Sequence, residues 1–296
     1  MRRRFVTLDV FTDQRFAGNP LAVVLDAEGL ADATLQAIAR EFNLSETVFV
    51  LAPSLAGPRA RLRIFTPLSE LAFAGHPTVG TAALLARLDG GSQAREFLLE
   101  EGVGLVHCTV ESVDEDHAHA RFELPRVPTA LGPVAAPERV AAALGLSPTD
   151  LGCEDFAPTR WTAGVPITFV PVRGLAQIRS CRVDLGLWDA VDPPGAAFVF
   201  CRESIDPGHA FHARMFAPSL GVPEDPATGS AVAAFAGLLS QFACPGDGEH
   251  VYVIEQGYEM GRPSLITLCV TVRDRQLSRV AIGGQVVVVS EGTVEA

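Results

Sequence analysis

The 296-residue sequence lacks the features that mark several large classes of protein. No hydrophobic run approaches the roughly 18 residues that a membrane-spanning helix needs. Lys and Arg number 23 against 35 Asp and Glu, and the resulting net charge of −12 argues against nucleic acid or an anionic membrane as a partner. A secretory signal is not expected either, because Asp9 and Asp13 interrupt the segment that would have to be apolar. We therefore expect a cytoplasmic protein that acts on a small molecule.

Motifs for metals and nucleotides are also missing. The cysteines show no CxxC spacing, which favours buried free thiols over disulfides or a zinc site. His117 and His119 follow an acidic run, where an exposed turn is a better interpretation than a metal site. His209 and His212 have no matching carboxylate pattern, so we interpret them as structural. We expect neither a metal nor a cofactor. The cysteines are Cys108, Cys153, Cys181, Cys201, Cys244 and Cys269.

The composition is that of a globular protein, with 48% hydrophobic and 20% charged residues. The length suits two domains, and strand-like segments dominate both halves. A stretch rich in Pro, Ala and Val after residue 124 is the best boundary. We expect an N-terminal domain of residues 1–124, a linker of residues 125–136 and a C-terminal domain of residues 137–282. The closing strand, residues 283–296, could pair with either sheet and return to the N-terminal domain.

Two stretches of the first half have counterparts in the second half. Arg63–Pro67 aligns with Arg214–Pro218, and Pro77–Ala82 aligns with Pro226–Ala231. An internal repeat of this kind indicates two pseudo-symmetric modules. The fold class we expect is therefore α/β (α+β), with two similar domains.

The second repeated motif precedes an apolar run in each half, Val79–Leu88 and Ala231–Phe242, and follows a titratable residue, His76 or Asp225. Pro favours a helix start, so we expect two helices that begin at these side chains. Helices that are apolar all round should run through the middle of their domains. Their N-terminal amides suit a bound carboxylate, and both would meet in one cleft if the modules face each other. Taken singly, His76 and Asp225 could be helix caps. Ser230 could simply hydrogen-bond back to a backbone carbonyl of its own helix.

Glu46 lies where an amphipathic helix, Asp32–Phe42, gives way to an apolar strand, Thr47–Ala52. A carboxylate packed on that strand would lose hydration, which would raise its pKa towards the range useful for moving protons at neutral pH. A solvated surface residue is the alternative, and spacing alone does not select Glu46.

A set of motifs extends nearly from end to end: Asp9–Thr12, Phe16–Val24, Asn43–Thr47, Phe73–Thr78, Glu224–Ala231, Gln256–Gly257 and Gly261–Ser264. In these motifs the chain resembles the PhzF-like family of phenazine-biosynthesis isomerases and epimerases, which shares its architecture with diaminopimelate epimerase. The resemblance implies two α/β domains, each with a mixed sheet wrapped around a central helix, and a substrate cleft between them. It also implies a homodimer.

The resemblance assigns the acid/base role to Glu46 and places His76 and Asp225 beside the substrate as catalytic residues that orient it or shuttle a proton. The expected reaction is a cofactor-independent isomerisation, in which Glu46 moves a proton within a small carboxylate-bearing molecule such as 2,3-dihydro-3-hydroxyanthranilate or a related metabolite. The cysteine pair of diaminopimelate epimerase has no equivalent here, which argues against a two-thiol racemase. The residues expected to bind substrate are Asn19, Gly75, Gly229 and Ser230.

Two alternatives stay open. His76, Asp225 and Ser230 contain the ingredients of a serine hydrolase, although Ser230 lies in a predicted helix rather than on a nucleophile elbow. The same fold could also bind a metabolite without turning it over.

Overall fold

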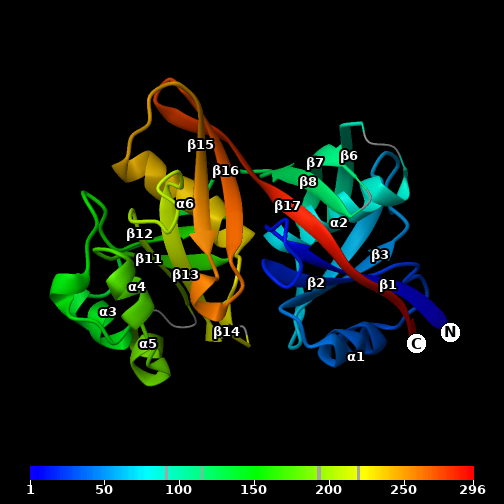
Figure 1. The fold of residues 1–296 in the computed structure, drawn as a ribbon, viewed down its shortest axis with the longest axis horizontal. Coiled ribbons are helices and arrows are strands. Elements are labelled where there is room, and N and C mark those ends of the chain that lie inside the picture. Colours follow the sequence, from blue (N-terminus) through cyan, green and yellow to red (C-terminus); the bar gives the residue numbers. More distant parts are fainter. Residues whose placement is uncertain (91–92, 115, 192–194, 219–220) are drawn as a thin grey trace. The chain divides into compact units, whose positions relative to one another are not determined.

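The computed structural model describes residues 1–90, 93–114, 116–191, 195–218 and 221–296. It divides into two units (Figure 1). Unit 1 comprises Met1–Pro125 and Ile282–Ala296, and unit 2 comprises Arg126–Ala281. The last strand therefore begins in unit 2 and ends in unit 1.

Unit 1 is a ring of strands around one helix. The ring runs through β1, β2, β3, β4, β6, β7, β8 and β17, and the pairing of β17 with both β1 and β8 closes it. Helix α2 lies within the ring and is buried along most of its length (Figure 1). Burial on all sides explains why this helix has no polar face. The elements are β1 (Arg2–Val10), β2 (Asn19–Val24), α1 (Asp32–Phe42), β3 (Glu46–Leu51), β4 (Ala60–Phe65), β5 (Glu70–Leu71), α2 (Gly75–Leu88), β6 (Arg95–Glu101), β7 (Gly104–Val113), β8 (His117–Glu123) and β17 (Gln276–Glu295).

Unit 2 repeats this strand pairing. Antiparallel β10–β11, parallel β11–β12, antiparallel β12–β13 and parallel β13–β15 correspond to β1–β2, β2–β3, β3–β4 and β4–β6. The strand order confirms the predicted internal repeat. The elements are β9 (Thr129–Ala130), α3 (Pro137–Ala143), η1 (Pro148–Asp150), β10 (Thr159–Thr162), β11 (Pro166–Pro171), α4 (Leu175–Ser180), α5 (Leu185–Val191), β12 (Ala196–Cys201), β13 (Phe211–Ala217), β14 (Val222–Asp225), α6 (Gly229–Phe242), β15 (Gly248–Gln256), η3 (Tyr258–Met260) and β16 (Ser264–Arg273).

Helix α6 is the central helix of unit 2. Its residues from Ala231 to Leu239 are buried, and Phe235 lies among the rings of the surrounding strands. Burying side chains of this size is worth roughly 1.5–3 kcal/mol each, so this aromatic cluster is a main source of stability in unit 2. The rings that contact Phe235, with centroids 4.8 to 5.8 Å away, are Phe169, Phe198, Phe200 and Phe211.

The repeated arginine makes corresponding contacts with a glutamate and a phenylalanine in both units. Arg63 donates two hydrogen bonds of 2.7 and 2.6 Å to Glu70 on β5. Arg214 donates two hydrogen bonds of 2.7 and 2.9 Å to Glu224 on β14. Each guanidinium also lies over the phenylalanine two residues further on, 5.1 Å from the ring centroid in unit 1 and 4.7 Å in unit 2. The repeat therefore extends from strand order to individual side-chain contacts.

The starts of the two central helices correct the predicted alignment. Helix α2 begins at Gly75, with Ala74 as its N-cap, so His76 is the second helical residue rather than the cap. Helix α6 begins at Gly229, whereas Asp225 closes strand β14 and precedes the helix by four residues. The counterpart of His76 is therefore Ser230, not Asp225. The repeated proline misled the alignment because Pro is tolerated throughout the first helical turn as well as before it.

Of the other local predictions, some are confirmed and some are wrong. Helix α1 matches its predicted range, and Asn43 caps it in the left-handed conformation. Four of the six cysteines are buried, but Cys244 is exposed and Cys269 is half-buried. The exposed turn predicted at His117 and His119 is wrong, because both residues lie in β8, where alternate residues are buried against the core. Their polar composition concealed a strand with only one buried face.

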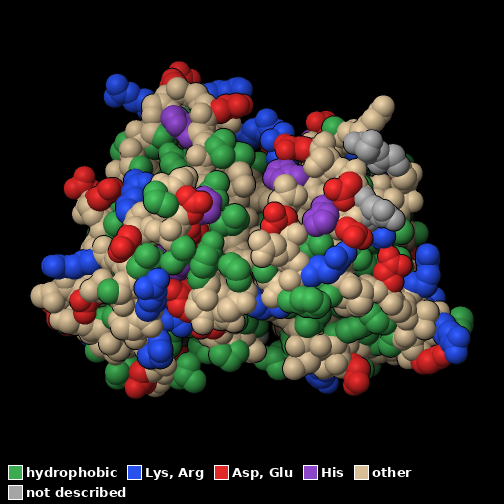
Figure 2. All heavy atoms as spheres, in the orientation of Figure 1, with side chains coloured by type: hydrophobic (Ala, Val, Ile, Leu, Met, Phe, Trp, Pro, Cys, Tyr) green, Lys and Arg blue, Asp and Glu red, His purple; other side chains and the backbone are tan. Residues whose placement is uncertain are grey.

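The surface carries mixed charge. Figure 2 shows acidic and basic side chains interspersed over the face in view. Among the described residues, no helix is both long and apolar enough to cross a membrane.

Candidate active site

Three of the predicted site residues lie together in unit 1. Asn19 and Glu46 open the parallel strands β2 and β3, so both start at the same edge of the sheet. His76 lies in the first turn of α2. Its Nε2 is 3.5 Å from Oε2 of Glu46, and its Nδ1 is 3.3 Å from Nδ2 of Asn19. The fold thus joins residues that are far apart in the sequence.

His76 is a neutral hydrogen-bond donor in this site. Its side chain is 4% exposed, and burial lowers its pKa to about 3. The amide nitrogen of Asn19 can only donate, so Nδ1 of His76 accepts and Nε2 carries the hydrogen. The contact with Glu46 therefore joins an imidazole N–H to a carboxyl group and is not a salt bridge between two charges.

Glu46 combines burial with access. Its side chain is 15% exposed, although the carboxyl oxygen that faces His76, Oε2, is buried. The following strand residues, Thr47 to Phe49, are fully buried. Glu46 thus stands at the border between the core and the solvent.

The N-terminus of α2 adds hydrogen-bond donors to this group. Within the described residues, no side chain caps the helix at Ala74. The amides of Gly75 and His76 lie at the positive end of the helix dipole, where an anion is favoured. The arrangement suits a substrate carboxylate beside Glu46.

A second polar group surrounds Asp225 in unit 2. The Thr228 hydroxyl donates to Oδ2 of Asp225 at 2.5 Å, and Nε2 of Gln256 donates to the Asp225 carbonyl at 2.7 Å. Gln256 also accepts from the amide of Thr228 at 3.1 Å. These bonds fix the turn between β14 and α6, which leads into the predicted residues Gly229 and Ser230. The structure thus places Asp225 and His76 in different units.

The roles of Thr228 and Gln256 were not predicted, although a sequence signal existed. Gln256–Gly257 is one of the motifs of the resemblance. Gly257 has φ +79°, and a Cβ there would lie 2.4 Å from the Arg262 carbonyl oxygen and 2.6 Å from that of Pro226. The glycine thus lets the end of β15 approach the turn after Asp225.

Replacing Gly257 with Ala should destabilise the protein more than the same change at Gly261. Both residues have left-handed backbone, which costs a non-glycine residue about 1–2 kcal/mol. A Cβ at Gly261 meets nothing within 4 Å, whereas one at Gly257 meets two carbonyls. We expect Gly257→Ala to cost a further 1–3 kcal/mol, approximately. Urea denaturation of both variants measures the difference, and equal losses would contradict the close approach.

Glu101 is a buried carboxyl group that sequence analysis did not single out. It ends β6 and shares a hydrogen bond with the Thr78 hydroxyl at 2.8 Å. Burial, the largest influence, raises its pKa to about 8. The polar context of Glu100–Glu101 at the end of a strand resembles a solvated turn, so its burial depends on the tertiary fold.

The Glu101 ionisation should make the protein less stable as the pH rises. Between 4.5, the ordinary pKa of a glutamate, and the folded-state pKa of about 8, the folded state binds more protons, so the free energy of unfolding falls with rising pH. His76 has the opposite effect between about 3 and 6.5, because its pKa is lowered in the folded state. The interval between 6.5 and 8 therefore isolates Glu101 from His76.

We expect the urea midpoint of the wild type to fall across that interval and that of Glu101→Gln to fall less, because Gln cannot ionise. The full effect of one group is about 1.4 kcal/mol per pH unit. Parallel midpoints for the two proteins would show that Glu101 is not protonated in the folded state.

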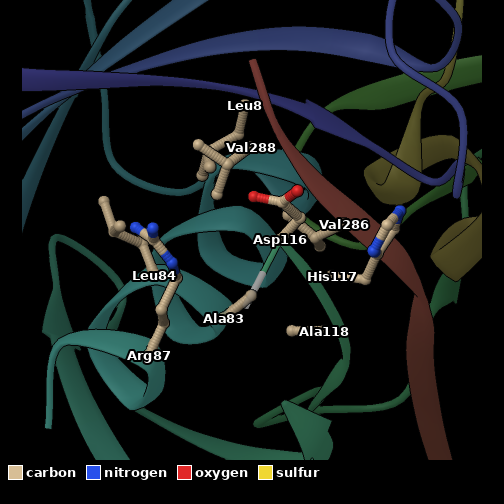
Figure 3. A pocket seen from close by; sticks show the side chains of 9 residues that line it. All are labelled: Leu8, Ala83, Leu84, Arg87, Asp116, His117, Ala118, Val286 and Val288. Atoms are coloured by element: carbon tan, nitrogen blue, oxygen red, sulfur yellow. The ribbon is translucent and has the colours of Figure 1, made fainter. Parts of the chain in front are cut away.

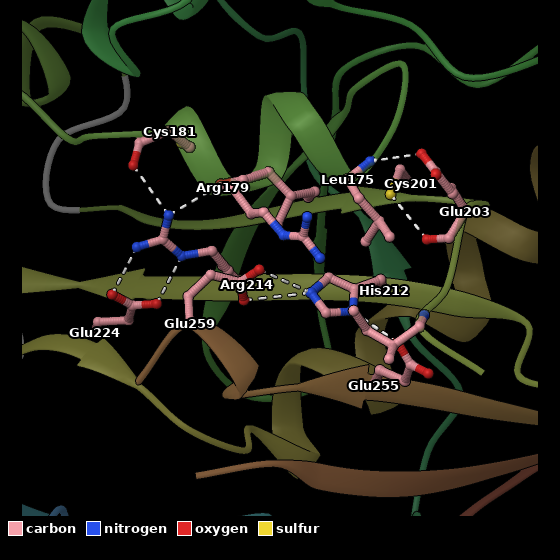
Figure 4. A network of polar contacts seen from close by, with 12 residues as sticks. Leu175, Arg179, Cys181, Cys201, Glu203, His212, Arg214, Glu224, Glu255 and Glu259 are labelled. Atoms are coloured by element: carbon pink, nitrogen blue, oxygen red, sulfur yellow. Dashed lines mark hydrogen bonds and ion pairs between the residues drawn. The ribbon is translucent and has the colours of Figure 1, made fainter. Parts of the chain in front are cut away.

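A polar network on β13 gives His212 the carboxylate partners that no sequence pattern indicated, and its structural role stays a prediction. Nδ1 of His212 is 2.7 Å from Glu255, and its Nε2 is 3.1 Å from Glu259 (Figure 4). These carboxylates raise its pKa against the opposing effect of burial, which is the largest influence. His209 also contacts Glu255, at 2.7 Å. The carboxylates that the sequence pattern did not indicate belong to β15 and η3, more than 40 residues away in sequence.

A small hollow in unit 1 is separate from the candidate site. It lies between α2, β8 and β17, and its volume is about 10 Å³ (Figure 3). The α2 residues that line it, Ala83, Leu84 and Arg87, lie at least seven residues beyond His76. The hollow admits about one water molecule and is too small for a substrate. Among the described residues, no group of three or more His, Cys, Asp or Glu could hold a metal.

Solved structures define the class of this fold. A PhzF-family phenazine biosynthesis protein of Bacillus anthracis matches with a TM-score of 0.90 and 26% identity over 100% of both chains. A predicted epimerase of Pseudomonas aeruginosa matches with a TM-score of 0.82 and 32% identity over 99% of both chains. The chain thus has the mixed α+β fold of diaminopimelate epimerase-like isomerases, as predicted.

Sequence comparison identifies the family. Residues 8–292 match the family described as phenazine biosynthesis-like protein, and the chain belongs to this family. It is 48% identical to an uncharacterized isomerase of Mesorhizobium japonicum, over 98% of each chain. It is 35% identical to the trans-2,3-dihydro-3-hydroxyanthranilate isomerase of Pseudomonas chlororaphis, again over 98% of each. The predicted resemblance is confirmed, and the protein is a member of an isomerase family.

Proposed function

We propose that the protein is a cofactor-independent isomerase that moves a proton within a small carboxylate-bearing substrate. The observation that carries this proposal is the pairing of Glu46 with His76. A glutamate whose side chain is 15% exposed places its carboxyl oxygen 3.5 Å from the Nε2 of a buried, neutral imidazole, at the start of a helix. One group can take up and release a proton while its neighbour stays in one protonation state.

Each residue has a distinct part in the proposed reaction. Glu46 removes a proton from a carbon acidified by a neighbouring unsaturated or carbonyl group and returns one to another atom. His76 donates its Nε2 hydrogen to orient the substrate or the carboxyl group, and Asn19 holds the imidazole in that tautomer. The amides near Gly75 hold the substrate carboxylate.

The proposal also gives residues of unit 2 a role in binding or orienting substrate. The Asp225 carboxylate is held by Thr228, and Ser230 lies in the first turn of α6. Gly229, like Gly75, supplies a helix-end amide without a side chain in the way.

Two observations support a reaction without a cofactor. The sequence contains no lysine, so no side-chain amine of this chain can hold a cofactor or substrate as a Schiff base. Proton transfer next to an activating group also needs only an acid/base residue and donors for the developing charge.

The relatives suggest the substrate to try first. The Pseudomonas enzymes that are 33–35% identical to this chain are named for trans-2,3-dihydro-3-hydroxyanthranilate. Such a molecule has a carboxylate and an unsaturated ring, which the proposed reaction requires. We propose this compound or a related small carboxylate as the substrate.

Incubation in D₂O with trans-2,3-dihydro-3-hydroxyanthranilate, followed by proton NMR, tests the proposal. We expect a product isomer of unchanged mass in H₂O and deuterium at carbon in D₂O. A change of mass, such as the uptake of water in hydrolysis, would contradict isomerisation. Binding without any deuterium at carbon, across a panel of small unsaturated carboxylates, would favour the non-catalytic alternative.

The serine hydrolase alternative is weakened by the state of His76. A histidine whose pKa is about 3 is a poor base for the hydroxyl of a serine at neutral pH. Its Nδ1 accepts a hydrogen bond from Asn19, whereas the Nδ1–H of a triad histidine donates to a carboxylate. Labelling of Ser230 by a fluorophosphonate would restore this alternative.

A further inference from the structure

The Thr78 hydroxyl in the first turn of α2 lies between two oxygen atoms. Its Oγ1 is 2.8 Å from the Ala74 carbonyl oxygen and 2.8 Å from Oε1 of Glu101. Thr78 is fully buried and Glu101 is 5% exposed. The three groups therefore form a chain of short contacts away from solvent.

The number of hydrogens available to these contacts indicates the protonation state of Glu101. A hydroxyl carries one hydrogen, and a carbonyl oxygen can only accept. If Glu101 were ionised, the single hydrogen of Thr78 could serve only one of its two contacts. If Glu101 is protonated, it donates to Thr78, and Thr78 donates to Ala74. Only the protonated form satisfies both contacts, because a close pair of buried oxygens without a hydrogen between them is costly.

The surroundings of Glu101 agree with a neutral carboxyl group. On the adjacent strand β7, Cys108 is the ionisable group that interacts with it, and burial together with Glu101 raises the pKa of that thiol. Helix α2 presents Thr78, which is uncharged. On β4, Arg61 pairs in register with Glu100 and influences that exposed carboxylate. Burial is thus the main influence on the pKa of Glu101.

The chain of contacts ends directly at the candidate site. Ala74 is the N-cap of α2, and the next two residues are Gly75 and His76. The bond from the Thr78 hydroxyl to the Ala74 carbonyl, at 2.8 Å, is shorter than the 3.3 Å bond from the Thr78 amide. A second bond, from the Val103 amide to the Ala72 carbonyl at 3.1 Å, ties the β6–β7 turn to the same segment.

We propose that Glu101 is a positioning residue that acts as a protonated carboxylic acid, holding the start of α2 through Thr78 and thereby placing His76 against Glu46. When Glu101 ionises, its carboxylate takes the Thr78 hydrogen, and the Ala74 carbonyl loses its shortest bond. His76, two residues further on, then changes its environment. The inference concerns the geometry of the site, and its test needs no substrate.

Infrared difference spectra between about pH 6 and pH 10 test the protonation state, because this interval brackets the pKa of about 8. We expect the carbonyl band of a protonated carboxylic acid in the wild type at pH 6, lost on titration with a midpoint near 8. The band should be missing from Glu101→Gln. A wild-type spectrum without this band, or a band of undiminished intensity in Glu101→Gln, would overturn the proposal.

Nitrogen-15 NMR of labelled histidine tests the link to His76. We expect the His76 imidazole signals to shift with the same midpoint in the wild type and to stay constant in Glu101→Gln and Thr78→Val. Thr81→Val is the matched control, because Thr81 is another buried threonine of α2 that lies outside the chain of contacts. It should titrate like the wild type.

A His76 signal that does not follow Glu101 in the wild type would show that Glu101 does not position it. Persistence of the shift in Thr78→Val would likewise overturn the route through Thr78. If that variant does not fold, Glu101→Gln still decides the question, because its amide keeps the size of the side chain and can donate to Thr78.

Discussion

Replacement of Glu46 with Gln should reduce kcat by about 10²- to 10⁴-fold, the contribution that general acid/base catalysis typically makes. Gln has nearly the same shape but cannot take up and release a proton. Since the His76 contact and the helix amides remain, substrate binding should change much less than turnover, and KM should stay within a few-fold of the wild type. Steady-state kinetics on the proposed substrate measure both constants.

Glu41→Gln is the matched control for this prediction. Glu41 is an exposed residue of helix α1 and lies outside the site, so its replacement should leave kcat unchanged. Circular dichroism should show that both variants are folded. Wild-type turnover in Glu46→Gln would exclude Glu46 as the proton carrier.

Arg214→Ala should lower the free energy of unfolding by about 3–5 kcal/mol, the usual cost of removing one partner from a buried ion pair. The Arg214 side chain is 7% exposed and that of Glu224 is 20% exposed. The guanidinium also donates to the carbonyls of Ile178 and Cys181 at 2.9 and 3.0 Å. Its removal leaves one carboxylate and two carbonyls without these donors.

The repeat supplies the control in the same chain. Arg63 makes the corresponding pair with Glu70, but it is 24% exposed, and its further partner Asp32 is 84% exposed. Water can replace these contacts, so Arg63→Ala should cost only about 1 kcal/mol. Urea denaturation of both variants gives the comparison. Equal losses would show that burial does not distinguish the two copies.

The parts of the fold that could be predicted are those that a local sequence pattern indicates. The apolar runs after His76 and before Phe242 are too uniformly hydrophobic to have a solvated side, so central helices followed from composition alone. The repeated arginine motif indicated the duplication, and the structure shows why the motif recurs. Glu46 could be placed at the start of a strand because a helix and its cap end just before it.

The features that could not be predicted depend on contacts between residues that are far apart in the sequence. The carboxylate partner of His212 reaches it through parallel pairing of β13 with β15, and no local pattern encodes that partner. Glu101 has a sequence context typical of a surface turn, yet the ring of strands buries it against α2. The alignment of His76 with Asp225 failed because it followed a proline, whereas the helices start from the glycines Gly75 and Gly229.

The most direct test of proton transfer by Glu46 is the exchange of substrate C–H hydrogen in D₂O, followed by NMR in the wild type and in Glu46→Gln at saturating substrate. The proposed mechanism predicts exchange with the wild type and its loss with the variant, while the variant still binds the compound. Exchange at the wild-type rate in Glu46→Gln would show that another group carries the proton.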